Sequence, residues 1–159
     1  MQYEVVRMSA EGVEQIIGTV STPSFSDGTV APSQGYAYRV RAVGEDATSP
    51  YGARDVATTF TFTDSPPLAG LTIRRAHVAE LRDAVNALRS AAGLPPASWT
   101  DSIVAQSTPV RAAHILELRS RLTEAFTAFG LPPPAFGAPV AAGGVIRAAE
   151  VQELRTVMR

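Results

Sequence analysis

Two histidines are the residues of this chain that most resemble metal ligands. His77 and His114 occupy equivalent positions on the apolar side of two helix-like segments. Imidazole is the commonest side-chain ligand of metals in proteins, so the pair suggests a metal site. No HExxH motif or His cluster accompanies them, however, and a third copy of the segment has Glu150 here. We therefore expect structural histidines, no metal and no cofactor.

Two aspartates suggest calcium as a second possible ligand. Asp64 and Asp101 each follow a threonine in the sequence TDS. The alternating carboxylates of a calcium-binding loop are absent, and the third copy has Gly137 and Ala138 instead. Aspartate is also a favoured helix N-cap. N-capping is therefore the expected role.

Six further charged residues recur at constant spacing. They are three arginines and three glutamates: Arg74, Arg111, Arg147, Glu80, Glu117 and Glu153. Within one copy Arg and Glu are six positions apart, or about 120° of helix rotation, so they do not face each other. Two interpretations stay open. Each Glu pairs with an Arg of a neighbouring copy, or the Arg row binds an anionic glycan.

Composition favours a non-catalytic protein. There is no Cys, and two His are the only imidazoles, so neither a thiol nucleophile nor a Ser/His/Asp arrangement can be assembled from motifs. The formal net charge is −1 without runs of like charge, which argues against a nucleic-acid partner. No segment is long enough to span a bilayer, and no signal peptide is seen. An exported protein would carry its signal upstream.

A repeat of 37 residues organises the second part of the chain. Its aromatic first residues are Phe62, Trp99 and Phe136, and the copies cover residues 62–98, 99–135 and 136–159. They share [I/V]-R-x-A-[H/E]-x-x-E-L-R. The apolar spacing predicts helices near 73–91, 109–129 and 146–157, which stack in a compact unit with the aromatic residues as wedges between them.

The ends of these helices also have sequence signatures. Thr72 and Thr108 are expected N-caps, with Pro109 at the first helical position. Gly93 and Gly130 precede Leu-Pro and predict left-handed C-caps.

The first 61 residues alternate with the period of strands. Five strands are expected in YEVVRM, VEQIIGTV, FSDGTV, YAYRVRAV and DVATTFTF. In the fourth, Tyr36, Tyr38 and Val40 share one face, while Arg39 and Arg41 share the other. An apolar face of this kind is expected to pack against a second sheet.

This part resembles strands C to G of a fibronectin type III domain, through Val30-x-Pro32-x-x-x-Tyr36, YRVRAV and SPYG. The resemblance implies that Tyr36 is a tyrosine corner bonded to upstream backbone. Strands A and B are missing, and either upstream sequence or another chain could supply them. The expected fold class is thus a partial immunoglobulin-like β-sandwich (1–61) followed by an all-α three-repeat unit (62–159). The uncovered inner face should carry Tyr38 and Val40.

The helical copies are similar to ELR repeats that follow fibronectin type III modules in predicted secreted multidomain proteins of bacteria. The segments IRRAH and IRAAE have a weaker resemblance to S-layer homology repeats. That resemblance implies cell-wall polysaccharide as the ligand. We expect an extracellular structural or assembly module of a cell-surface protein, fibre or appendage, partnered by itself or by the rest of a larger polypeptide. A glycan-binding anchor and an ancillary domain of a secreted hydrolase are the alternatives.

Overall fold

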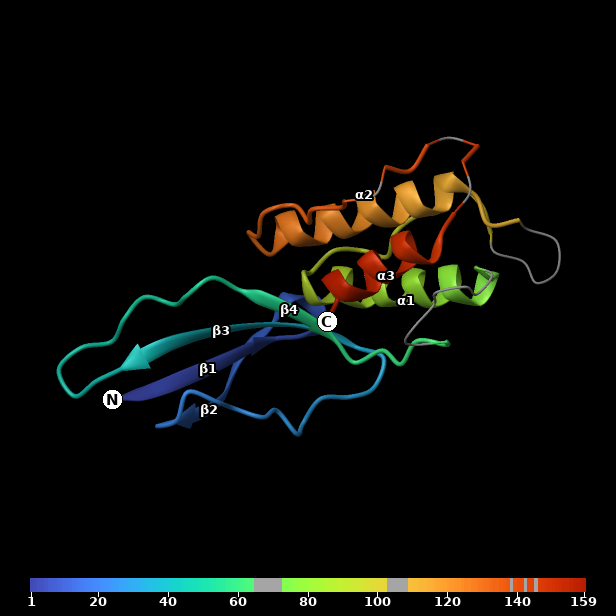
Figure 1. Ribbon diagram of the computed structural model, residues 1–159. Helices are drawn as coiled ribbons and strands as arrows, with labels where there is room; N and C mark the ends of the chain where they lie inside the picture. The colour runs from blue at the N-terminus through green and yellow to red at the C-terminus, as the bar shows by residue number, and fades with distance from the viewer. Residues whose placement is uncertain (65–72, 103–108, 138, 142, 145) are drawn as a thin grey trace.

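The computed structural model describes residues 1–64, 73–102, 109–137, 139–141, 143–144 and 146–159. Strands β1 (Gln2–Met8), β2 (Glu14–Val20), β3 (Gly35–Val43) and β4 (Asp55–Thr58) come first, with a short 3-10 turn, η1 (Ala10–Gly12), after β1. Helices α1 (Arg75–Ala91), α2 (Ala112–Ala128) and α3 (Ala148–Val157) follow. The helices gather at one end of the sheet, and α1 lies nearest to it (Figure 1).

The four strands form one antiparallel sheet in the order β2-β1-β3-β4. Turn η1 joins β1 to β2, and Glu11 and Gly12 both adopt positive φ there. One register shift between Val5 and Val6 leaves Ile17 as an extra residue in β2. The predicted strand FSDGTV is not a strand, because the Asp27 carboxylate accepts hydrogen bonds from the N–H and hydroxyl of Thr29 and so closes a turn.

Each copy of the repeat contributes one helix, as predicted. The predicted Gly stops are confirmed: Gly93 and Gly130 have φ near 73° and 74°, and the N–H groups of Leu94 and Leu131 donate to the carbonyls of Arg89 and Phe126. The starts differ from the prediction. Arg74, Arg111 and Arg147 are the N-caps, whereas Thr72 and Thr108 lie outside the described residues.

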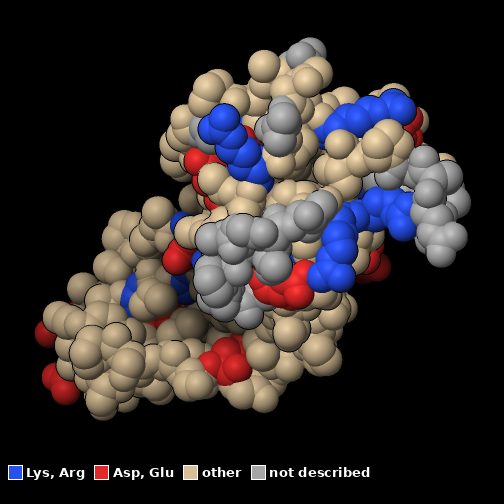
Figure 2. All heavy atoms as spheres, turned by 45° about the vertical axis from the view of Figure 1, so that its right-hand side comes forward, with Lys and Arg blue, Asp and Glu red and all other residues tan. Residues whose placement is uncertain are grey.

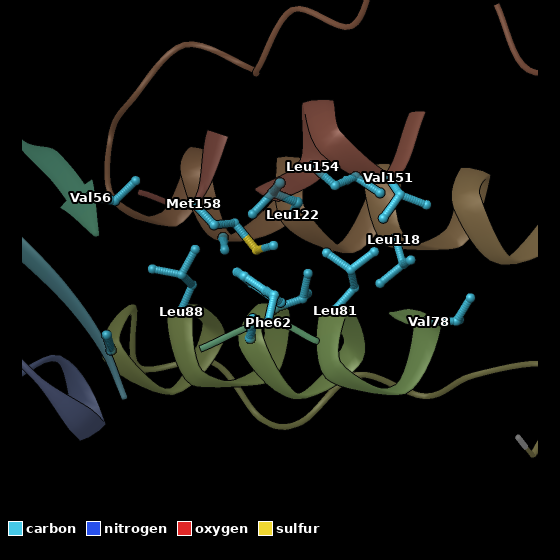
Figure 3. Close-up of a cluster of buried hydrophobic side chains, with 14 of the residues drawn as sticks. Val56, Phe62, Val78, Leu81, Leu88, Leu118, Leu122, Val151, Leu154 and Met158 are labelled. Atoms are coloured by element: carbon cyan, nitrogen blue, oxygen red, sulfur yellow. The ribbon is translucent and has the colours of Figure 1, made fainter. Parts of the chain in front are cut away.

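The helices run parallel to one another. Arg82 and Arg89 of α1 pair with Glu117 and Glu124 of α2, and both pairs have the same sequence offset. Their apolar faces form one cluster, which includes Leu81, Leu88, Leu118, Leu122, Val151, Leu154, Met158 and Phe62 (Figure 3). A lone helix of this length cannot bury such a stripe, so the three copies depend on each other.

The sheet shares this core with the helices. Ala37 of β3 and Val56 of β4 are buried in the same cluster as the helix residues, and Met8 packs against it. Gly35 lets α1 approach closely, since a Cβ there would lie 2.6 Å from the backbone of Ala87. The terminal turn of the chain also reaches the sheet, where the N–H of Thr58 donates to the carbonyl of Met158.

The expected fold class is therefore wrong. The described residues form a single four-stranded sheet with three helices, and they contain neither a second sheet nor a separate all-α repeat unit. The alternation in β3 correctly indicated two unlike faces. It could not show that a helix layer would cover the face that carries Arg39 and Arg41. The helices fit there because the first residues of the strand on that face, Gly35 and Ala37, are small.

Candidate functional site

The ELR motifs connect each helix to the next copy. The guanidinium of Arg82 lies over the ring of Trp99 at 4.7 Å, donates to the carbonyl of Asp101 and faces Glu117 at 3.5 Å. Arg119 repeats this one copy later, over Phe136 at 4.6 Å and with a 2.9 Å hydrogen bond to Glu153. Each arginine thus contributes both an ion pair and a cation–π contact.

The third copy returns to the first. Arg155 lies over Phe62 at 4.8 Å, donates to the carbonyl of Thr63 and faces Glu80 at 3.5 Å. Its side chain is fully buried. Burial lowers the pKa of Arg155, and the charge of Glu80 opposes that effect. The three copies therefore form a closed ring, in which Arg155 takes the role that Arg82 and Arg119 have between consecutive copies.

The repeated glutamates also hold their own copies. Glu80, Glu117 and Glu153 accept hydrogen bonds from the backbone N–H groups of Thr63, Thr100 and Gly137 respectively. Their ion pairs cross from copy to copy, as predicted, but with the arginines of the ELR motifs in place of those at the helix starts. The shared motif displayed these arginines in the sequence. Spacing within one copy could not identify them as the partners.

The aromatic first residues pack as wedges. Phe62 is buried in the core cluster, and Trp99 and Phe136 pack partly buried against it. Because an arginine covers each ring, none of the three presents a free stacking platform.

Arg74, Arg111 and Arg147 lie at the N-termini of the three helices with exposed side chains. The helices start at the same end of the molecule, and Figure 2 shows the basic side chains of this region in separate groups. Arg74 pairs with Asp64, and Arg111 lies 3.6 Å from Asp101. The expected Arg–Glu bridges are therefore not formed by these residues.

Each histidine is part of a helix cap. Nδ1 of His77 accepts a hydrogen bond from the N–H of Arg74, while its Nε2 lies 3.0 Å from the Asp64 carboxylate. His114 makes the same contacts with Arg111 and Asp101. The acceptor role of Nδ1 places the proton on Nε2, which donates to the aspartate. Both ring nitrogens are engaged, so the histidines are structural.

In the third copy a glutamate takes the place of the histidine in the helix cap. Glu150 accepts the hydrogen bond from the N–H of Arg147. A carboxylate at this position needs no second acidic group to orient it, whereas an imidazole does. This explains why Asp64 and Asp101 accompany histidines; they are not N-caps, since their carboxylates bind side chains instead of helix N–H groups.

The face of the sheet opposite the helices carries an open apolar hollow. It has a volume of about 720 Å³ and is lined by Tyr3, Val5, Val20, Thr22, Pro23, Ser24, Phe25, Ser26, Asp27, Val30, Tyr38, Val40 and Thr59. Val40 is 41% exposed on this face, as predicted for the uncovered side. Phe25 lies directly over Gly18, where a Cβ would be only 2.5 Å from the ring.

Asp27 is the one charged residue among the described residues that line the hollow. Its carboxylate accepts hydrogen bonds from Arg7, Tyr38 and Thr29. Burial raises the pKa of Asp27, but these hydrogen bonds outweigh burial and bring it to about 2. Burial and the bond to Asp27 raise the pKa of Tyr38 to about 12. The charges are thus internally compensated, and the remaining exposed lining of the hollow is mostly apolar, with hydroxyl groups of serine and threonine residues between the apolar side chains.

Tyr36 holds the start of β3 beside this hollow. Its hydroxyl accepts a 2.9 Å hydrogen bond from the N–H of Ala31, which is the upstream backbone contact that the resemblance implied. The guanidinium of Arg7 covers the ring at 5.1 Å.

Comparison of the chain with protein-family models, with curated proteins and with solved structures gives no match. None of the described helices has the length and apolar character needed to cross a membrane. Within the same residues, no three acidic, His or Cys side chains group in a way that could hold a metal ion. The structural features that bear on function are therefore the ring of ELR contacts and the apolar hollow.

Proposed function

We propose that this chain is a non-catalytic structural or assembly module of a larger bacterial cell-surface protein, fibre or appendage. The open apolar hollow of the sheet is the observation that carries the proposal. An open hollow of this volume with a mostly apolar lining is characteristic of binding sites. The repeated ELR side chains support the same view, because they hold the copies together and are not presented to a substrate.

The location and the role can be tested on the bacterium that encodes the chain. Antibodies raised against residues 1–159 should label intact cells as strongly as permeabilised cells. In the purified protein, Val40→Asp should abolish binding of an apolar dye to the hollow, whereas Val13→Asp, at an exposed site outside it, should not. Labelling of permeabilised cells alone, or dye binding unchanged by Val40→Asp, would contradict the proposal.

A glycan-binding anchor is the second candidate, favoured by the exposed arginines at one end of three parallel helices. Helix N-termini add positive potential at that end. The triple variant Arg74→Ala, Arg111→Ala, Arg147→Ala should then lose retention on purified cell wall while its unfolding midpoint stays within a few degrees. Equal retention of both proteins removes this candidate.

A further inference from the structure

The two edge strands of the sheet, β4 and β2, differ in whether other parts of the chain hydrogen-bond to them. At the β4 edge, the N–H and the hydroxyl of Thr58 both donate to the carbonyl of Met158. At the β2 edge, no described residue outside β1 makes a backbone hydrogen bond with Glu14–Val20. A row of unpaired N–H and C=O groups is a template for another strand.

Strand β2 also lacks the usual chemical protection of an edge. Residues 15–20 contain no charge and no proline, and Ile16 is 55% exposed. Val13, which precedes the strand, is exposed as well. The one charged residue, Glu14, is already paired with Arg39 and Arg54. Lysine, proline or inward-pointing charge normally prevents pairing at such a position. The bulge at Ile17 is the one edge-protecting feature of this strand, and it leaves the strand without a described backbone partner outside β1.

From these observations we propose that a second copy of this chain pairs antiparallel along β2, which extends the sheet across a two-fold axis near Ile17. This inference rests on the proposed assembly function and identifies a second copy of the chain as the partner in that assembly. Around that axis Gln15 faces Thr19 of the other copy, and Glu14 faces Val20. No like charges therefore meet, and two open edges are satisfied at once.

A second copy fits this edge better than a partner of complementary charge. Residues 15–20 offer no charge by which such a partner could be selected. Self-pairing also places the apolar hollows of both copies on the same face of one continuous sheet, because Val20 belongs both to β2 and to the lining of the hollow.

The absence of cysteine makes a direct test possible. Ile17→Cys introduces the only thiol, and mild oxidation should give a covalent dimer, since residues opposed across an antiparallel pair lie within disulfide range. Gly28→Cys, in an exposed loop with open space around it, is the matched control and should stay monomeric. Equal cross-linking of both variants would overturn the proposal.

Sedimentation equilibrium of the unmodified chain supplies the second measurement. We expect a dimer whose dissociation constant rises about tenfold or more in Thr19→Lys, because an edge lysine opposes strand addition. Thr19 is exposed and lies opposite Glu4 of β1, so the lysine is accommodated in the folded chain. Gly28→Lys should leave the constant unchanged.

A monomer at every concentration, or a dimer indifferent to Thr19→Lys, would overturn the inference. Such a result leaves the proposed function standing if the chain is still found at the cell surface and Val40→Asp still removes dye binding. Loss of those two results with a dimer intact would instead overturn the proposed function.

Discussion

Asp27 is the side chain on which the conformation of the loop beside the hollow depends. It links Arg7 of β1, Tyr38 of β3 and Thr29 of its own loop. Because these are hydrogen bonds to a charged acceptor, they are much stronger with the ionised carboxylate than with the protonated one. Protonation of one residue therefore loosens three attachments.

The pKa of Asp27 gives this dependence a definite pH window. The folded-state pKa, about 2, lies below the ordinary value of 3.8, so the contribution to stability is complete above pH 3.8 and is lost as the pH falls toward 2. Asp27→Asn should lower the free energy of unfolding by about 1 to 2 kcal/mol at pH 7, after allowance for solvent screening. Urea unfolding at pH 7 and at pH 2 measures the difference.

The loss caused by Asp27→Asn should largely disappear at the lower pH, where about half of the native carboxyl groups and nearly all of those in the unfolded chain are protonated. Asp46→Asn, at an exposed position, is the control and should be neutral at both values. A loss of the same size at pH 2 would show that the ionised form is not what matters.

The helix starts supply a second test at this scale. His77→Ala removes a buried acceptor for the N–H of Arg74 and should cost about 1 to 3 kcal/mol of unfolding free energy. His77→Glu combined with Asp64→Ala reproduces the third copy, where Glu150 caps alone, and should recover most of that loss. Denaturant unfolding of both variants compares them directly. Failure of the double variant to recover would mean that Asp64 has a separate role.

Among the elements, the middle helix presents a matched pair of leucines. Leu118 is fully buried and Leu116 is 44% exposed on the same helix. Leu118→Ala should cost about 2 to 5 kcal/mol of unfolding free energy because it leaves a cavity in the shared core, whereas Leu116→Ala should cost less than about 0.5 kcal/mol. Chemical denaturation of the two variants measures both values. Similar losses would mean that the apolar stripe of α2 is assigned to the wrong face.

The connection between copies is tested by a double-mutant cycle. Arg82→Ala and Glu117→Ala should show a coupling energy of about 1 kcal/mol, since the pair is largely shielded from solvent. The cycle of Glu117 with Arg74 should be additive, because Arg74 instead pairs with Asp64. Coupling to Arg74 in place of Arg82 would contradict the ring.

Local sequence predicted the elements better than their starts or their arrangement. Gly93 and Gly130 end helices by a mechanism that involves only adjacent residues, so these C-caps could be predicted. The starts were missed because His77 and His114 take the place of the usual Glu in a capping box. Alternation predicted that Tyr38 and Val40 share one apolar face, and the missing strands A and B predicted that this face would be uncovered. The contact of Gly35 with α1 depends on residues far apart in the chain.

For the whole molecule, the closeness of sheet and helix layer is set by Gly35. A Cβ at this position would lie 2.6 Å from backbone atoms of Ala87 and Leu88. Backbone atoms cannot move aside as the end of a flexible side chain could. Gly35→Ala should therefore destabilise the protein by about 1 to 3 kcal/mol. Gly28→Ala, which meets nothing within 4 Å, is the control. Thermal unfolding should separate the two, and a neutral Gly35→Ala would mean that the layers are not in firm contact.

The contact between the third copy and the first also has a consequence for folding during translation. Arg155 reaches back 92 residues to Thr63, and Met158 reaches back 100 residues to Thr58. Contacts of such high sequence separation form late. During translation, Phe62 and Glu80 lack their arginine until the last helix has left the ribosome. Between the synthesis of Phe62 and the emergence of Arg155, the nascent chain therefore exposes part of this apolar core, and exposed apolar surface of this kind is open to chaperones and to aggregation.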